Sequence, residues 1–123
     1  MEPIVTERNF TQEVLASPIP VLVHFWAPWC GLCKLINPQL QKFQSQLGGN
    51  VKLVGINADS NFKLANAYHL TSLPTLILFE DGQILHRLEN FRGRDDVWEA
   101  LQAISFTCAT SRVRSRQYQT HSV

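Results

Sequence analysis

Residues 25–34 read FWAPWCGLCK, and this stretch decides the fold of the chain. Its two cysteines, Cys30 and Cys33, are separated by two residues. The apolar run at 21–26 predicts a strand that is buried on both faces, and a helix-like pattern follows over 34–47. A strand, a sharp turn and a helix place Cys30 at a helix N-terminus and Cys33 in the first turn. Residues three apart in such a turn lie about 5–6 Å from each other, so the two sulfurs can form a disulfide.

The position of the cysteines also predicts reactivity. The N-terminus of a helix favours negative charge, so a thiol at Cys30 is expected to lose its proton easily, and the thiolate is the reactive form. A Cys-x-x-Cys pair near a βαβ pattern is typical of a redox motif. The competing interpretation is a zinc site, which needs about four ligands. Cys108 and His121 could complete one, but no second ligand pair follows and His121 lies in a polar tail, so we expect no metal.

Composition bounds the class of protein. A chain of 123 residues with 45% hydrophobic residues is expected to form one domain with a buried core. The net charge of +1 predicts no nucleic-acid or membrane partner, and we expect a monomer. Three cysteines fit a secreted disulfide framework poorly, residues 1–6 lack a signal-peptide core, and no apolar run approaches the roughly twenty residues of a membrane span. The expected location is therefore the cytoplasm.

The order of the elements predicts an α/β sandwich. We expect a central mixed five-stranded sheet flanked by four helices. The predicted strands lie at 4–5, 21–26, 51–57, 75–79 and 83–88, with a turn at Asp81-Gly82, and the predicted helices lie at 7–16, 34–47, 61–68 and 95–104. Pro38 is expected to kink the second helix, because proline removes one backbone hydrogen bond.

The pattern stops at Ser105. Residues 105–123 are rich in Ser, Thr, Gln and Arg and show no helical apolar periodicity. We predict a folded domain over 1–104 and a flexible basic tail over 105–123. The tail is either a solvated terminus without function or a contact for an acidic partner or polyanion.

Several motifs together resemble the thioredoxin family. They are WCGLCK at 29–34, Pro38, Leu-Pro-Thr at 73–75 and Phe79-x-x-Gly82, and the resemblance covers about 4–104. It implies the thioredoxin fold for the domain over 1–104. It also implies that Cys30 is an exposed nucleophile that forms a mixed disulfide with a target protein, and that Cys33 is buried and resolves it. A thioredoxin reductase of unknown type would restore the dithiol, and no cofactor is expected.

The resemblance also implies a set of supporting residues. Pro74 is expected to be cis and to pack beside the disulfide, with Gly31 and Leu32 between the cysteines. The implied groove for target peptides is lined by Trp29, Leu73, Pro74 and Asn90. Asn90 stands where ungapped counting expects a glycine, and asparagine tolerates positive φ better than most residues.

Leu32 and His24 depart from the family pattern. Leu32 replaces the usual proline and restores a backbone N–H, which favours the thiolate. We therefore expect a reduction potential about 30 mV less negative than the roughly −270 mV of thioredoxin. His24 stands in place of a buried aspartate, and Gly55 replaces the lysine that often accompanies it. His24 is either a buried neutral histidine held by a hydrogen bond or a proton acceptor for the cysteines.

The predicted function is a thiol–disulfide oxidoreductase, an enzyme that reduces disulfides in target proteins through a Cys30/Cys33 cycle. Two alternatives stay open. One is a weaker reductant that acts as an oxidant or isomerase, and the other is a binding module of the same fold whose cysteines are incidental.

Overall fold

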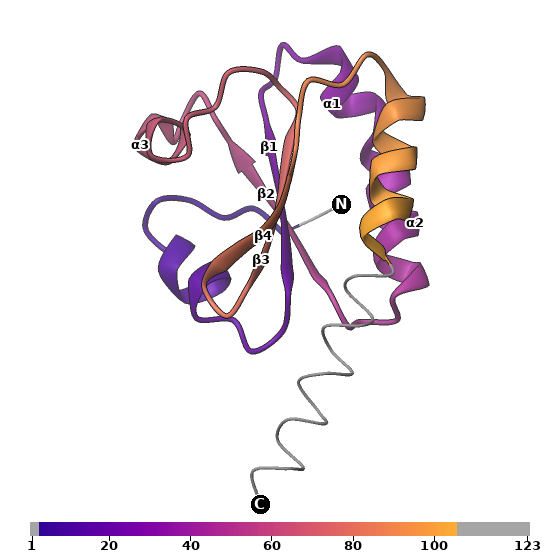
Figure 1. Ribbon diagram of the computed structural model, residues 1–123. Helices are drawn as coiled ribbons and strands as arrows, with labels where there is room; N and C mark the ends of the chain where they lie inside the picture. Colours follow the sequence, from indigo (N-terminus) through magenta and orange to yellow (C-terminus); the bar gives the residue numbers. More distant parts are fainter. Residues whose placement is uncertain (1–2, 106–123) are drawn as a thin grey trace, which may run out of the picture.

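A four-stranded mixed sheet forms the centre of the structure, a computed structural model that describes residues 3–105 (Figure 1). The strand order is β2-β1-β3-β4. β1 (Val21–Trp26) pairs in parallel with β2 (Lys52–Asn57) and antiparallel with β3 (Thr75–Glu80), and β3 pairs antiparallel with β4 (Gln83–Leu88). The predicted α/β class with a mixed sheet is confirmed.

The sheet differs from the prediction at one edge. The expected first strand is a single parallel bridge between Ile4 and Gly55. It ends at once because the N–H of Thr6 donates to the side chain of Asn9 (2.8 Å) rather than to a strand. Parallel pairing between named strands is limited to β1 and β2 in the described residues, because β3 runs antiparallel to β1.

Helices cover both faces of the sheet (Figure 1). η1 (Thr11–Leu15), a π-helical segment, and α3 (Phe62–Ala67) lie on one side. α1 (Gly31–Leu35), α2 (Asn37–Gln46) and the helical residues 94–105 lie on the other. Alternate residues of β1 enter the two cores, since Leu22 packs with α2 while Val23 and Phe25 pack with η1 and the turn after α3.

Two predicted helices are broken or irregular in the structure. The helix expected over 34–47 is two helices, α1 and α2, that meet at Ile36. Pro38 lies in the first turn of α2, where its missing N–H costs no hydrogen bond, so the chain restarts a helix instead of bending one. The helix expected over 7–16 is a turn followed by η1, in which the Ala16 N–H donates to the Thr11 carbonyl (2.8 Å).

The hairpin between β3 and β4 has the predicted two-residue turn. Asp81 and Gly82 have φ values of 53° and 77°, as a type I′ turn requires.

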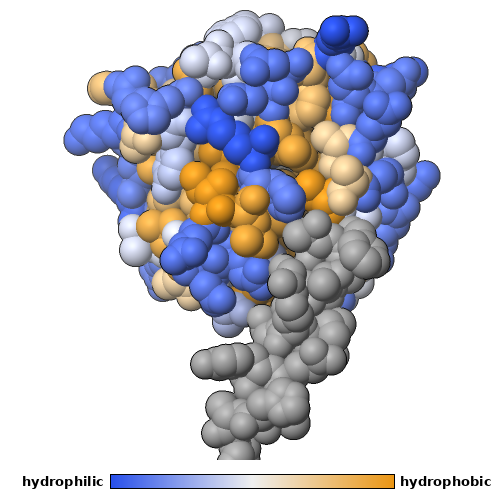
Figure 2. Space-filling model, viewed as in Figure 1, coloured by the Kyte–Doolittle hydropathy of each residue, from blue (hydrophilic) through white to orange (hydrophobic). Residues whose placement is uncertain are grey.

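In the view of Figure 1, apolar surface lies near the middle of the molecule (Figure 2). Ile84 and Leu85 are apolar residues of β4 that are 46% and 38% exposed.

Predictions for the end of the sequence fall almost wholly outside the described residues. Helical structure runs to residue 105, which is the last residue described. The remainder of the predicted tail over 105–123, including Cys108 and His121, lies beyond it.

Candidate functional site

Cys30 and Cys33 form a disulfide at the N-terminus of α1, with their Cα atoms 5.3 Å apart. β1 ends at Trp26, and the turn that follows brings Cys30 to the N-cap of α1 in an extended conformation. The Cys33 N–H donates to the Cys30 sulfur (3.1 Å). The local geometry therefore puts a hydrogen-bond donor and the positive end of a short helix next to one sulfur.

Both cysteines are buried in this oxidised state. Cys30 is 5% exposed and Cys33 is 2% exposed, so Cys30 is the more accessible of the two but less open than the resemblance implies. Reduction would leave the Cys30 sulfur accepting the Cys33 N–H, which stabilises a thiolate at that position. A second sulfur already within bonding distance makes ring closure intramolecular and fast.

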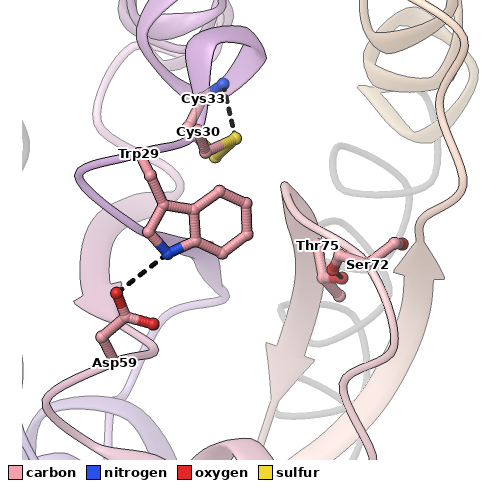
Figure 3. The surroundings of a disulfide bond; sticks show 6 residues. All are labelled: Trp29, Cys30, Cys33, Asp59, Ser72 and Thr75. Carbon is pink, nitrogen blue, oxygen red and sulfur yellow. Dashed lines mark hydrogen bonds between the residues drawn. A yellow bond between two sulfur atoms is a disulfide. The ribbon is translucent and has the colours of Figure 1, made fainter.

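Trp29 is 70% exposed and is held in place by a residue that the sequence did not single out for the site. Its indole Nε1–H donates to the carboxylate of Asp59 (3.0 Å), and Figure 3 shows the ring extending from the cysteines toward that carboxylate. Asp59 follows β2 just as Trp29 follows β1. Because these strands are parallel, the loops after them meet at one edge of the sheet. The position of Asp59 directly after β2 could therefore have indicated that it lies near Trp29.

The segment before β3 faces the cysteines and Trp29 across the site (Figure 3). The Leu73–Pro74 peptide bond is cis, and Pro74 is buried while Leu73 is half-buried. The Thr75 hydroxyl donates to the Ser72 carbonyl (2.7 Å) and closes the turn around them.

Asn90 adopts the left-handed conformation, with φ of 61°. Its side-chain oxygen accepts a hydrogen bond from the Ser72 hydroxyl (3.3 Å). The structure therefore joins Asn90, just after β4, to the segment that carries Leu73 and Pro74.

Gly31 and Leu32 begin α1 between the two cysteines. No atom lies within 4 Å of where a Cβ on Gly31 would stand, so crowding does not require glycine there. The Leu32 side chain is half-buried against the core beneath α1 and α2.

His24 is buried in β1, where it is 1% exposed. Together with Cys33, Lys34 and Asn37 it lines a partly open cavity of about 200 Å³, whose other lining residues are Ile4, Trp26 and Ala27. In the sheet register its neighbour on β2 is Gly55, which has no side chain to fill the space. The structure thus brings His24 and the deeper cysteine to one cavity, as a proton-transfer role would require.

Two other properties concern residues 3–105 alone. Within them, no three His, Cys, Asp or Glu side chains cluster in a way that could hold a metal ion. None of the helices in this part of the chain has the length and apolar character needed to cross a membrane.

Comparisons with known proteins agree with this geometry. The thioredoxin family model matches residues 2–103. Thioredoxin 1 of Synechococcus elongatus is 49% identical over 79 residues, which are 64% of this chain and 74% of that protein. Thioredoxin of Synechocystis is 44% identical over 81 residues, covering 66% and 76% of the two chains. Thioredoxin of Mycobacterium bovis is 39% identical over 90 residues, covering 73% and 78%.

Three findings lead to one conclusion. Two cysteines form a disulfide at a helix N-terminus, a mixed sheet has helices on both faces, and a family model matches most of the chain. The chain belongs to the thioredoxin family and is a thiol–disulfide oxidoreductase that acts as a protein-disulfide reductase.

Proposed function

We propose that Cys30 is the attacking nucleophile and Cys33 the resolving cysteine in the reduction of protein disulfides in the cytoplasm. The observation that carries this assignment is the hydrogen bond from the Cys33 N–H to the Cys30 sulfur, at the N-terminus of α1. It favours negative charge on Cys30, and Cys30 is also the more exposed of the two.

The two cysteines supply both electrons of the cycle, and the proton that the Cys30 thiol loses to solvent balances the one that the first target sulfur takes up. The Cys30 thiolate attacks one sulfur of a target disulfide, and the other target sulfur leaves and takes a proton. The Cys33 thiol then loses its proton, and its thiolate attacks the Cys30 sulfur and releases the second target thiol. The target gains two electrons and two protons, and the Cys30–Cys33 disulfide forms. A thioredoxin reductase is the proposed donor that returns the electrons.

The groove for the target is proposed to lie between Trp29 and the Leu73–Pro74 segment. Trp29 presents a large apolar surface that Asp59 holds in one orientation. Leu73, Pro74 and Asn90 form the opposite side, where the backbone before Pro74 can bind an extended peptide.

His24 is proposed as the proton acceptor for Cys33. The support is that both line the same cavity, which is large enough for a few water molecules to connect them. An imidazole nitrogen can accept a proton and pass it on, which suits this role.

Insulin reduction tests the assignment. Cys30→Ser is expected to abolish both the reaction and adduct formation. Cys33→Ser is expected to stop the reaction after the first step and accumulate a mixed disulfide on Cys30, visible by mass. Cys108→Ser is the matched control and is expected to keep full activity. Adducts on Cys33 in the Cys30→Ser protein would contradict the order of attack. If a Cys30→Ser, Cys33→Ser double variant kept the full function of the protein in the cell, that result would support a binding module.

A further inference from the structure

Arg87 is an arginine of β4 whose side chain reaches across to the end of α3. Its Nη1 and Nη2 donate to two successive backbone carbonyls, those of Tyr68 and His69, the second at 2.9 Å. Its Nε donates to the carboxylate of Glu89 (3.1 Å). The guanidinium is planar and presents its donors in a fixed fork, so these bonds hold the two carbonyls in one orientation.

Arg87 binds two carbonyls at the end of α3, those of the C-cap residue Tyr68 and of the next residue, His69. The N–H of Leu70 donates to Ala65 and that of His69 to Asn66, which is the hydrogen-bond pattern of a Schellman motif. His69 occupies the left-handed position, with φ of 53°. A positive charge is favoured at the carbonyl end of a helix, so Arg87 fixes the point at which the chain leaves α3.

The chain that leaves α3 at this point is the segment that forms one side of the proposed groove. Residues 69–74 run from the carbonyls held by Arg87 to the cis bond between Leu73 and Pro74. The far end of this segment is held by Asn90, whose side chain accepts a hydrogen bond from Ser72. Arg87 and Asn90 are three residues apart, so the end of β4 holds the segment at both ends.

We propose that Arg87 is a positioning residue for target recognition, one that sets where Leu73 and Pro74 lie relative to Cys30. This inference rests on the proposed function, because it assigns Arg87 the role of holding one side of the groove that is proposed to bind target proteins. Without the guanidinium, the Tyr68 and His69 carbonyls turn to water and the segment is ordered only when a target binds. The free-energy cost of ordering the segment weakens target binding without altering the chemistry at the sulfurs.

Two disulfide substrates of different size separate positioning from chemistry. Insulin occupies the groove, whereas the small aromatic disulfide DTNB reaches Cys30 without it. For Arg87→Met, which keeps the aliphatic stem, we expect KM for insulin to rise about tenfold with kcat nearly unchanged. We expect the DTNB rate to stay within about twofold of wild type.

Two further variants make the test specific. Arg87→Lys keeps one donor group and is expected to give an intermediate KM, about threefold above wild type. Glu89→Gln removes the ion pair but leaves both carbonyl bonds, so it is the matched control and its KM should stay within about twofold of wild type. If Arg87→Met does not fold, the comparison of Arg87→Lys with Glu89→Gln decides the question.

An equal loss with insulin and DTNB in Arg87→Met would overturn the inference, since a merely structural role predicts it. Amide hydrogen exchange gives a readout that does not depend on activity. We expect exchange at 70–73 to be faster in Arg87→Met than in Glu89→Gln, and equal exchange would also overturn the inference. If wild type reduces DTNB but not insulin, the proposed function fails, and hydrogen exchange alone then decides the positioning role.

Discussion

His24 and Cys33 line one cavity although they come from different elements, β1 and α1. If His24 accepts the proton of Cys33, then His24→Ala slows resolution of the mixed disulfide, on the order of 100-fold, because general bases contribute at least that much. Formation of the mixed disulfide should be nearly unaffected. Rapid-quench kinetics of a single turnover measure both steps.

The control for His24→Ala is Asn37→Ala, which changes another side chain of the same cavity and leaves the imidazole. We expect both steps to stay near wild type in that variant. If His24→Ala slowed formation and resolution equally, the imidazole would have a packing role only.

A second property predicted at the scale of one residue is the effect of Leu32 on the reduction potential. It lies in the first turn of α1, where backbone N–H groups have no partner within the helix. Leu32→Pro removes that donor, so the potential is expected to fall by about 30 mV, measured by titration against a dithiothreitol buffer. Leu32→Ala keeps the N–H and should not shift it. A shift in Leu32→Ala but not in Leu32→Pro would assign the effect to side-chain packing.

At the scale of elements, the turn between β3 and β4 depends on Gly82. Its φ is 77°, and an added Cβ would lie 3.3 Å from the carbonyl oxygen of Leu15. Gly82→Ala is therefore expected to destabilise the protein by about 1–2 kcal/mol, measured by denaturant unfolding. Gly93→Ala is the control, because no atom lies within 4 Å of its Cβ position. Equal midpoints for the two variants would show that the turn tolerates a side chain.

The break between α1 and α2 is also decided at this scale. Hydrophobic periodicity continues across 34–47, so the sequence reads as one helix with a kink. The structure has two, because Pro38 cannot donate to a carbonyl in the preceding turn and suits the start of a helix instead. The stretch that decides the redox chemistry is therefore a short helix of its own, Gly31–Leu35.

For the whole molecule, Tyr68 links stability to alkaline pH. Its ring packs near those of Phe10, Phe25 and Phe79, and burial raises the pKa of its hydroxyl above the ordinary 10.0. A raised pKa means that the folded state keeps its proton longer than the unfolded chain. The contribution of this pKa difference to the free energy of unfolding is complete below pH 10. It is lost as pH rises through the folded-state pKa.

Thermal unfolding from pH 8 to pH 11 measures this link. Tyr68→Phe cannot ionise, so its melting temperature should fall less steeply above pH 10 than that of wild type. Parallel curves for the two proteins would mean that Tyr68 does not carry the alkaline loss of stability.

Features that depend on residues close together in the chain could be predicted from the sequence. The cysteine spacing, the N-cap at Cys30 and the positive φ values at Asp81 and Gly82 are set within a single turn, so local rules predict them. Contacts between distant segments came from the packing of the folded chain. It paired β3 antiparallel to β1, joined Trp29 to Asp59, brought His24 and Cys33 to one cavity, and placed Arg87 on the end of α3. The reason is physical: each of these contacts depends on where separate elements pack, and the local pattern of a sequence does not specify that.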